Sequence, residues 1–382
     1  MLSKKQMDYT LFIVVLLLVS IGILMVYSSS FYYAMDKWDN KAYFFQKELL
    51  WSLIGLVGML VASQVNYRIY GKFAWLLLGG SLVLLFYVLA TGEVIGGAQR
   101  WIKIGKITIM PGEIAKFAVV VFMAQSLSKN QHKLKKLTEG VLPYLVLIGI
   151  FFTLILKQPN FSTALTVAGV MFVMLFIAGL PWLYVTMLGI GGFGAAVYFM
   201  VSAPYRMKRF TTFLDPFADP TSNGWQVVQS LYALGSGGLF GVGIGKSTQN
   251  KLYLPEPQND FIFATIGEEF GFLGSVLIIV LFMILIWRGI KIAVNAQDRY
   301  GCYLASGITA TIAIQAMINI AVTTSSVPTT GIPLPFISFG GNSLALLMGQ
   351  IGILLNISRF TTDQETSDNA NHTNRRRNSR AY

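Results

Sequence analysis

The chain has 382 residues, of which 54% are hydrophobic and only 12% charged, and its formal net charge is +12. A soluble domain typically has about 45–50% apolar and about 25% charged residues. The composition therefore excludes a soluble enzyme and a disordered chain, and the single cysteine excludes a disulfide scaffold. In a membrane protein, excess Lys and Arg is typical of cytoplasmic anchoring, so we expect no nucleic-acid partner.

Ten apolar segments recur along the chain, most of them close to the ~20 residues that a helix needs to cross a bilayer. Their apolarity is unbroken, which favours helices over the alternating strands of a barrel. The sequence therefore predicts an all-α polytopic membrane protein with about ten transmembrane helices. The predicted segments are 9–28, 44–63, 73–91, 111–127, 141–156, 163–180, 182–201, 261–287, 302–323 and 342–357.

The Lys and Arg residues of the short loops predict the orientation. They are concentrated on the side that holds both termini, which is therefore predicted to be cytoplasmic. A large extracytoplasmic loop, 202–260, follows helix seven and precedes helix eight. We expect one transmembrane domain over residues 1–360 and a disordered basic cytoplasmic tail over 361–382.

Carboxylates are the candidates for proton transfer on the outer side. The two histidines, His132 and His372, lie on the predicted inner side, so an outer site must use Asp or Glu. Asp260 directly precedes an apolar helix and can be an N-cap, a general base or both. The helix dipole there is expected to favour its ionised form. Glu268 lies deeper in the same helix, where a buried carboxylate needs a partner.

A second unusual outer stretch is 96–117. Trp101 and the alternating isoleucines indicate an interfacial segment that lies on the membrane, with Arg100 and Lys103 at headgroup level. Such cations suit a diphosphate, although simple anchoring explains them equally well. Glu113 and Lys116 fall one turn apart after Pro111, which predicts a structural ion pair at the start of a helix.

Two glycine- or proline-rich segments favour structure over cofactor binding. The run 235–247 resembles a phosphate loop, but Phe240 stands where that pattern needs glycine, so no nucleotide cofactor is expected. Its glycines are better explained by tight turns and close backbone approach. The segment 327–343 holds three prolines, which prevent continuous helix, and at membrane level such backbone is expected to wall a site.

Taken together, these motifs resemble the SEDS family of peptidoglycan polymerases (FtsW, RodA and SpoVE), in the family's order over nearly the whole chain. Two positions depart from the family pattern, because Asn160 replaces an aspartate and Asn342 a serine. The motifs that carry the resemblance are Gly97-Ala98-Gln99-Arg100-Trp101, Pro111-Gly112-Glu113 with Lys116, Gln158-Pro159, Tyr205-Arg206, Phe213-Leu214-Asp215-Pro216, Leu254-Pro255-Glu256, Asp260-Phe261-Ile262-Phe263-Ala264, Gly267-Glu268-Glu269 and Gly331-Ile332-Pro333-Leu334-Pro335-Phe336-Ile337-Ser338.

The resemblance implies an enzyme that polymerises lipid II into glycan at the outer face of a bacterial cytoplasmic membrane. It implies Asp260 as the catalytic base. Substrate contacts are then expected from Arg100, Trp101, Lys103, Arg206, Glu256 and Ser338, with structural support from Glu113, Lys116 and Glu268. Mg²⁺ or Mn²⁺ is a candidate cofactor at the diphosphate. The expected partners are lipid II, a class B penicillin-binding protein and other divisome membrane proteins.

Other functions stay open on the sequence. A lipid II flippase, once proposed for this family, would show internal repeats and a polar path through the membrane. A non-enzymatic scaffold for division proteins and a RodA-like elongation polymerase are further alternatives. Asn259-Asp260 and the basic tail favour an FtsW-like role at the division septum.

Overall fold

The computed structural model describes residues 6–95, 98–105, 107–220, 224–251 and 253–361. The predicted tail from residue 362 onward lies outside these described residues, as do Gly97 and Lys106 of the second outer stretch. Within the described chain, each of the ten predicted apolar segments forms a helix, which confirms the predicted fold class. These helices are α1 (Tyr9–Trp38), α2 (Tyr43–Gln64), α4 (Ala74–Thr91), α5 (Pro111–Asn130), α6 (Leu142–Lys157), α7 (Phe161–Ile177), α8 (Trp182–Val201), α11 (Ile262–Val294), α12 (Arg299–Thr323) and α13 (Asn342–Ser358).

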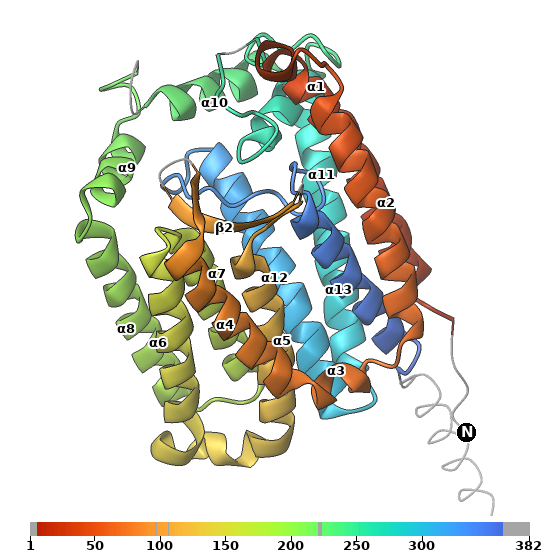
Figure 1. The fold of residues 1–382 in the computed structure, drawn as a ribbon, viewed down its shortest axis with the longest axis vertical. Coiled ribbons are helices and arrows are strands. Elements are labelled where there is room, and N and C mark those ends of the chain that lie inside the picture. Colours follow the sequence, from red (N-terminus) through yellow and green to blue (C-terminus); the bar gives the residue numbers. More distant parts are fainter. Residues whose placement is uncertain (1–5, 96–97, 106, 221–223, 252, 362–382) are drawn as a thin grey trace, which may run out of the picture.

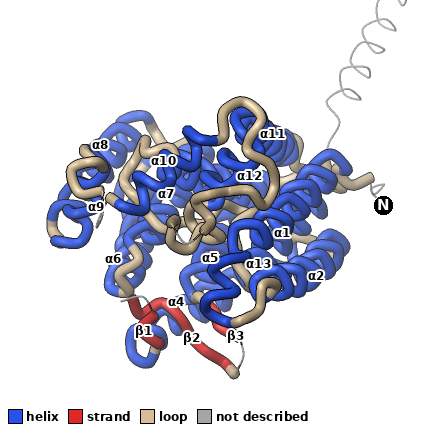
Figure 2. The backbone as a smooth tube through the Cα atoms, turned by 90° about the horizontal axis from the view of Figure 1, so that it is seen from above, coloured by secondary structure: helices blue, strands red, loops and turns tan. Residues whose placement is uncertain are grey.

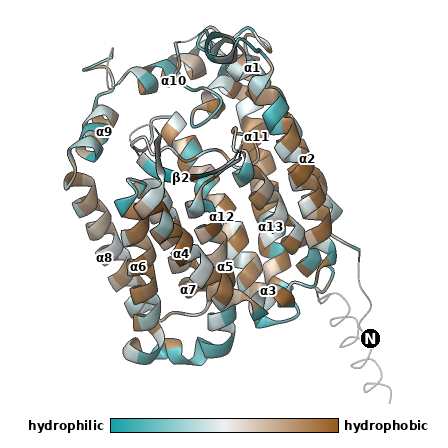
Figure 3. Cartoon of the chain, in the orientation of Figure 1, coloured by the Kyte–Doolittle hydropathy of each residue, from teal (hydrophilic) through white to brown (hydrophobic). Residues whose placement is uncertain are grey.

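Length and composition differ among these helices. Seven helical stretches of the described chain are long and apolar enough to cross a membrane. Helices α7 and α13 are apolar but have only 17 residues each. Helix α5 has 20 residues and carries the charged side chains of Glu113, Lys116 and Lys129. Apolar residues cover the middle of the bundle and polar residues gather at its two ends (Figure 3).

The helices form one upright bundle (Figure 1). Helix α12 occupies its centre and packs against α5, α7 and α11, while α13 packs against α2. Helix α8 stands at the periphery, and none of its residues is buried. The short elements are α3 (Arg68–Lys72), a 3₁₀ turn (Gln131–Lys135) and a π turn (Leu137–Val141).

The second outer stretch contributes two strands to a small sheet, which the sequence did not predict, and its position relative to the membrane stays a prediction. The antiparallel strands are β1 (Glu93–Ile95), just before the stretch, and β2 (Ala98–Ile104) and β3 (Ile107–Ile109) within it, in the order β1-β2-β3. Ile102 is buried whereas its neighbour Lys103 is exposed, which is the two-residue period of a strand. The sheet lies at one edge of the bundle, beside α4 (Figure 2).

The predicted long loop is largely helical. It contains α9 (Pro204–Leu214) and α10 (Trp225–Ser236), which lie with β2 at the same end of the bundle (Figure 1). We call this end, formed by β1–β3 and residues 202–260, the loop end.

The glycine-rich run docks on a kink in α11. At Gly271 the backbone has φ 71° and ψ −165°, so the helical hydrogen-bond ladder is interrupted. The freed carbonyls of Glu268 and Glu269 accept from the amides of Val242 and Gly243 at 2.9 and 3.0 Å. A Cβ on Gly241 would lie 2.1 Å from the Glu269 carbonyl oxygen. The prediction that these glycines permit close backbone approach is confirmed.

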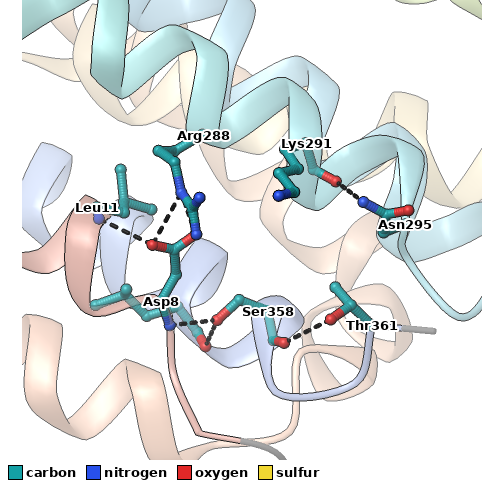
Figure 4. A network of polar contacts seen from close by, with 8 residues as sticks. Asp8, Leu11, Arg288, Lys291, Asn295, Ser358 and Thr361 are labelled. Atoms are coloured by element: carbon teal, nitrogen blue, oxygen red, sulfur yellow. Dashed lines mark hydrogen bonds and ion pairs between the residues drawn. The ribbon is translucent and has the colours of Figure 1, made fainter. Parts of the chain in front are cut away.

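At the opposite end, a polar network ties three helices together (Figure 4). Arg288 of α11 pairs with Asp8 at 2.6 Å, and Asp8 also caps α1 through the Leu11 amide. The Asp8 amide donates to Ser358 Oγ at the end of α13, at 3.1 Å. This network fixes the ends of α1, α11 and α13 relative to one another.

Candidate active site

Asp260 lies in the turn before α11, at the loop end of the bundle. The N-cap of α11 is Phe261, and no side chain caps this helix, so the N-cap interpretation of Asp260 is wrong. Burial and the nearby Glu256 carboxylate raise the Asp260 pKa to about 6, against the opposing effect of Arg209 and Arg100. Desolvation outweighs the two cations, so the Asp260 pKa is raised, but at about 6 it leaves the carboxylate ionised at neutral pH.

The backbone on the N-terminal side of Asp260 is held by the proline-rich segment 327–343. Ser338 Oγ donates to the Asn259 carbonyl at 2.7 Å and accepts from the Leu334 amide at 2.8 Å. The Phe339 amide donates to the Gln258 carbonyl at 2.9 Å. The segment thus walls the site as predicted. The buried Ser338 hydroxyl therefore both donates and accepts a hydrogen bond within the protein, and these bonds hold the turn before Asp260. Substrate contact by Ser338 stays a prediction.

Arg209 and Arg100 are the two cations whose charges lower the Asp260 pKa. Arg100 of β2 donates to the carbonyls of Gln158 and Pro159, in the turn between α6 and α7. Arg209 of α9 donates to the Thr329 carbonyl at 3.2 Å. Burial, and next the charge of Arg209, lower the Arg100 pKa. The two guanidinium groups therefore repel each other. Because one carboxylate balances only one of the two positive charges, the site is suited to bind a further anion.

Arg206 contacts the start of α7 and the end of α8. Its guanidinium stacks on the rings of Phe161 and Tyr205, at 5.5 and 5.2 Å from their centres, and donates to the Phe199 carbonyl. It is not among the charged groups that shift the Asp260 pKa, so substrate contact by Arg206 stays a prediction. Asn160, where the family has aspartate, caps α7 by accepting from the Thr163 amide at 3.3 Å. Capping needs no charge, so the asparagine retains this role.

The other predicted contact residues are spread over the loop end. Glu256 is exposed and accepts from the side chain of Asn259 at 2.8 Å, which places its charge beside Asp260. Trp101 is half-buried in β2, opposite Glu93 of β1, and Lys103 is exposed in the same strand, opposite Thr108. The structure brings Glu256 to Asp260 and places Trp101 and Lys103 along the strand that carries Arg100.

Glu113 and Lys116 form the predicted ion pair. Lys116 Nζ lies 2.7 Å from Glu113 Oε1, and the two side chains are only 5% and 8% exposed. Glu113 also lines a small cavity beneath the proline-rich segment, together with Gln315, Ser338 and Gly340. The pair thus supports the same segment that holds the turn at Asp260.

Glu268 is buried and satisfied by the end of the glycine-rich run. Its carboxylate accepts from Ser247 Oγ and from the amides of Thr248 and Gln249. These contacts agree with a structural role and explain how a carboxylate is tolerated in an apolar helix.

Sequence reasoning missed Arg209 and Asn319. Arg209 follows Arg206 by three residues, the spacing of one helix face, and this could have indicated a second cation. Asn319 is one of two amides, with Gln315, in an apolar segment, and its contact with the Asp260 turn spans 59 residues of sequence. Only the tertiary structure shows that contact.

The geometry defines a class of protein: a polytopic membrane protein with a carboxylate and two arginines gathered at one end of its bundle. The sequence model of the cell cycle protein family FtsW, RodA and SpoVE matches residues 8–363. The chain therefore belongs to this family, the SEDS proteins.

Relatives and solved structures agree with that assignment. Over 94% of its length the chain is 44% identical to stage V sporulation protein E of Bacillus subtilis, covering 99% of that protein. Over 92% of its length it is 43% identical to a probable peptidoglycan glycosyltransferase FtsW of Trichlorobacter lovleyi, covering 93% of it.

Among solved structures, the fold matches a chain of a peptidoglycan synthase complex with a TM-score of 0.76 and 26% identity, over 92% of this chain and 98% of that one. RodA of Thermus thermophilus matches with a TM-score of 0.70 at 24% identity, over 94% and 98%, and shows the shared fold alone.

Proposed function

We propose that the protein is a peptidoglycan glycosyltransferase that polymerises lipid II. The observation that carries this proposal is the Asp260 carboxylate at one end of a membrane bundle, where it lies against Gly331 and the charges of Arg209 and Arg100 lower its pKa. Relatives at 43% and 41% identity that bear the name peptidoglycan glycosyltransferase FtsW support it.

The residues suit a single inverting displacement. The Asp260 carboxylate accepts the proton of the sugar 4-hydroxyl, whose oxygen attacks the anomeric carbon of the glycan attached to undecaprenyl diphosphate. The new glycosidic bond forms as the bond to the diphosphate breaks, so an α-linked donor gives a β-linked product. Asp260 then returns its proton to water.

The two arginines are assigned to the leaving group. A diphosphate gains negative charge as its bond to the sugar breaks, and fixed cations at that point stabilise the transition state. The described residues contain no group of three His, Cys, Asp or Glu side chains that could hold a metal ion. The described residues therefore do not fit a metal ion held by the protein alone, and Mg²⁺ or Mn²⁺ would be held in part by the diphosphate, as magnesium usually is in phosphate sites.

A reconstituted assay tests the function. We expect the purified full chain in liposomes to convert lipid II into polymeric glycan, measured by gel separation of labelled product. If the protein moves lipid II across the bilayer but forms no polymer, it is a flippase, and if it does neither, the scaffold alternative replaces the proposal.

The Asp260 pKa gives the assay a pH dependence. Only the ionised carboxylate can accept a proton, and its pKa is raised to about 6. We therefore expect the polymerisation rate to fall about tenfold per pH unit below pH 6 and to level off above it. A rate that stays constant from pH 7 to pH 5 would contradict Asp260 as the base.

The orientation proposed from the loop charges places both termini in the cytoplasm and the loop end outside. We expect single cysteines introduced at the exposed Tyr253 and Phe240 to react with a membrane-impermeant thiol reagent on intact cells, with Cys302 replaced by Ser. A cysteine at Lys135, in the turn between α5 and α6, should react only after the membrane is opened. The reverse labelling would overturn the proposed orientation.

Partners and cellular location are further parts of the proposal. One structural relative is part of a complex that couples polymerization to crosslinking, which supports a penicillin-binding protein partner, with other divisome membrane proteins at the septum. Co-purification with the class B enzyme and a fluorescent fusion at the division site are the expected results. A fusion spread along the side wall would favour the elongation role.

A further inference from the structure

Asn319 of α12 connects the loop end to the proline-rich segment 327–343. Its side-chain Nδ2 donates to the carbonyl of Asp260 at 2.8 Å and to the carbonyl of Ile332 at 2.7 Å. Asn319 is only 1% exposed, so these bonds form away from bulk water. One amide thus joins the turn that carries the carboxylate to the proline-rich segment.

The orientation of this amide follows from its partners. Both partners are carbonyl oxygens, which only accept, so the NH₂ group must face them. The amide oxygen, Asn319 Oδ1, is buried and has no hydrogen-bond partner in the described chain. A buried acceptor without a donor costs free energy. The two donated hydrogen bonds must offset this cost, so they are the reason for an asparagine at this position.

The proline-rich segment, which Asn319 holds at Ile332, also lies against the Asp260 carboxylate. Gly331 precedes Ile332, has φ +78°, and a Cβ built on it would lie 3.3 Å from Asp260 Oδ2. Holding Ile332 therefore sets the wall against which the carboxylate lies. Ser338 and Phe339 hold Asn259 and Gln258, so Asn319 supplies the contact to Asp260 itself.

We propose that Asn319 is a positioning residue for the glycosyl transfer, which holds Asp260 and Ile332 together so that the carboxylate lies at a fixed place beside Arg100 and Arg209. The proposal rests on the proposed function. It assigns no chemical step to Asn319, which acts only through the backbone of Asp260.

Replacing the amide should change turnover more than binding. In Asn319→Leu the side chain keeps about the same volume and adds no charge beside Asp260, but it cannot donate to either carbonyl. A displacement of about 1 Å in a reacting group can cost about 10²-fold in rate, so we expect kcat to fall about 10- to 100-fold with KM within about twofold.

The pH profile gives a readout that a general loss of stability would not move. Burial has the largest effect on the Asp260 pKa and raises it. Glu256 raises it further, whereas Arg209 and Arg100 lower it. In Asn319→Leu no new charge is added, and an Asp260 carboxylate released towards water loses part of its burial, so the midpoint of the pH–rate profile should move below 6.

Asn356 provides a matched control. It is fully buried in α13 and donates to the Ser63 carbonyl at 2.9 Å, at the opposite end of the bundle. We expect Asn356→Leu to lower the melting temperature while leaving kcat and the pH midpoint unchanged.

The full chain in liposomes is assayed with lipid II for each variant, after the parent has been shown to form polymer. The proposal is overturned if folded Asn319→Leu has the parental kcat and pH midpoint, or if both Leu variants lose activity only in proportion to their melting temperatures. Should Asn319→Leu not fold, the same measurements are made on Asn319→Ser, whose single hydroxyl can donate to only one carbonyl. A parent that forms no polymer would instead refute the proposed function.

Discussion

Asp260→Asn is expected to yield a folded protein that binds lipid II and makes no detectable glycan. The amide keeps the size of the carboxyl group but cannot accept the proton of the attacking hydroxyl. Loss of a general base typically costs about 10²–10⁴-fold in rate. The measurement is the initial rate of polymerisation by purified protein, with lipid II binding determined separately.

Stability separates this chemical role from a structural one. Asp260 precedes α11, and its folded pKa of about 6 lies above its ordinary value of 3.8. Its contribution to stability is therefore present at low pH and is lost as the pH rises through about 6. The amide of Asp260→Asn does not ionise, so the variant avoids the destabilisation that ionisation of Asp260 causes. At neutral pH it should therefore melt no lower than the parent.

The control for this experiment is Asp36→Asn, an exposed carboxylate near the end of α1. It should leave both the polymerisation rate and the melting temperature unchanged. Near-parental polymerisation by Asp260→Asn would refute the assignment of the base. A large fall in its melting temperature would make Asp260 a structural residue.

Breaking the Glu113–Lys116 pair is expected to have the largest effect on stability. With the two side chains 5% and 8% exposed, Glu113→Gln leaves a buried ammonium group without its counter-charge. Removing one partner of a buried pair costs about 3–5 kcal/mol. We expect poor expression and a lower melting temperature from either single variant, and recovery in the charge-swapped double variant Glu113→Lys with Lys116→Glu.

The chain contains a matched control pair at the same spacing. Lys136 and Glu139 are 3.0 Å apart and are 68% and 56% exposed. Exposed pairs contribute about 0–1 kcal/mol, so Glu139→Gln should leave expression unchanged. If both Glu113→Gln and Lys116→Met fold like the parent yet do not polymerise, the pair has a catalytic role and the structural interpretation is wrong.

The positions of the ten apolar helices and the Glu113–Lys116 pair could be predicted because both depend on nearby residues. A run of about 20 apolar side chains must cover its own backbone hydrogen bonds in a bilayer, whatever the rest of the chain does. Ion pairs three residues apart are likewise set by helix geometry. The close approach of the glycine-rich run was also predictable, since its residues allow conformations that others avoid.

The strands at 93–109 could not be predicted from long apolar runs, because short strands show only a two-residue alternation of side chains. The environment of Asp260 was missed for a different reason. Its pKa depends on burial and on charges brought from β2 and α9, more than 50 residues away in sequence. The sequence by itself determined the helices, the candidate base and the family. Only the tertiary structure decided that Arg209 and Asn319 reach Asp260, because contacts between distant segments depend on how the helices pack and leave no local pattern.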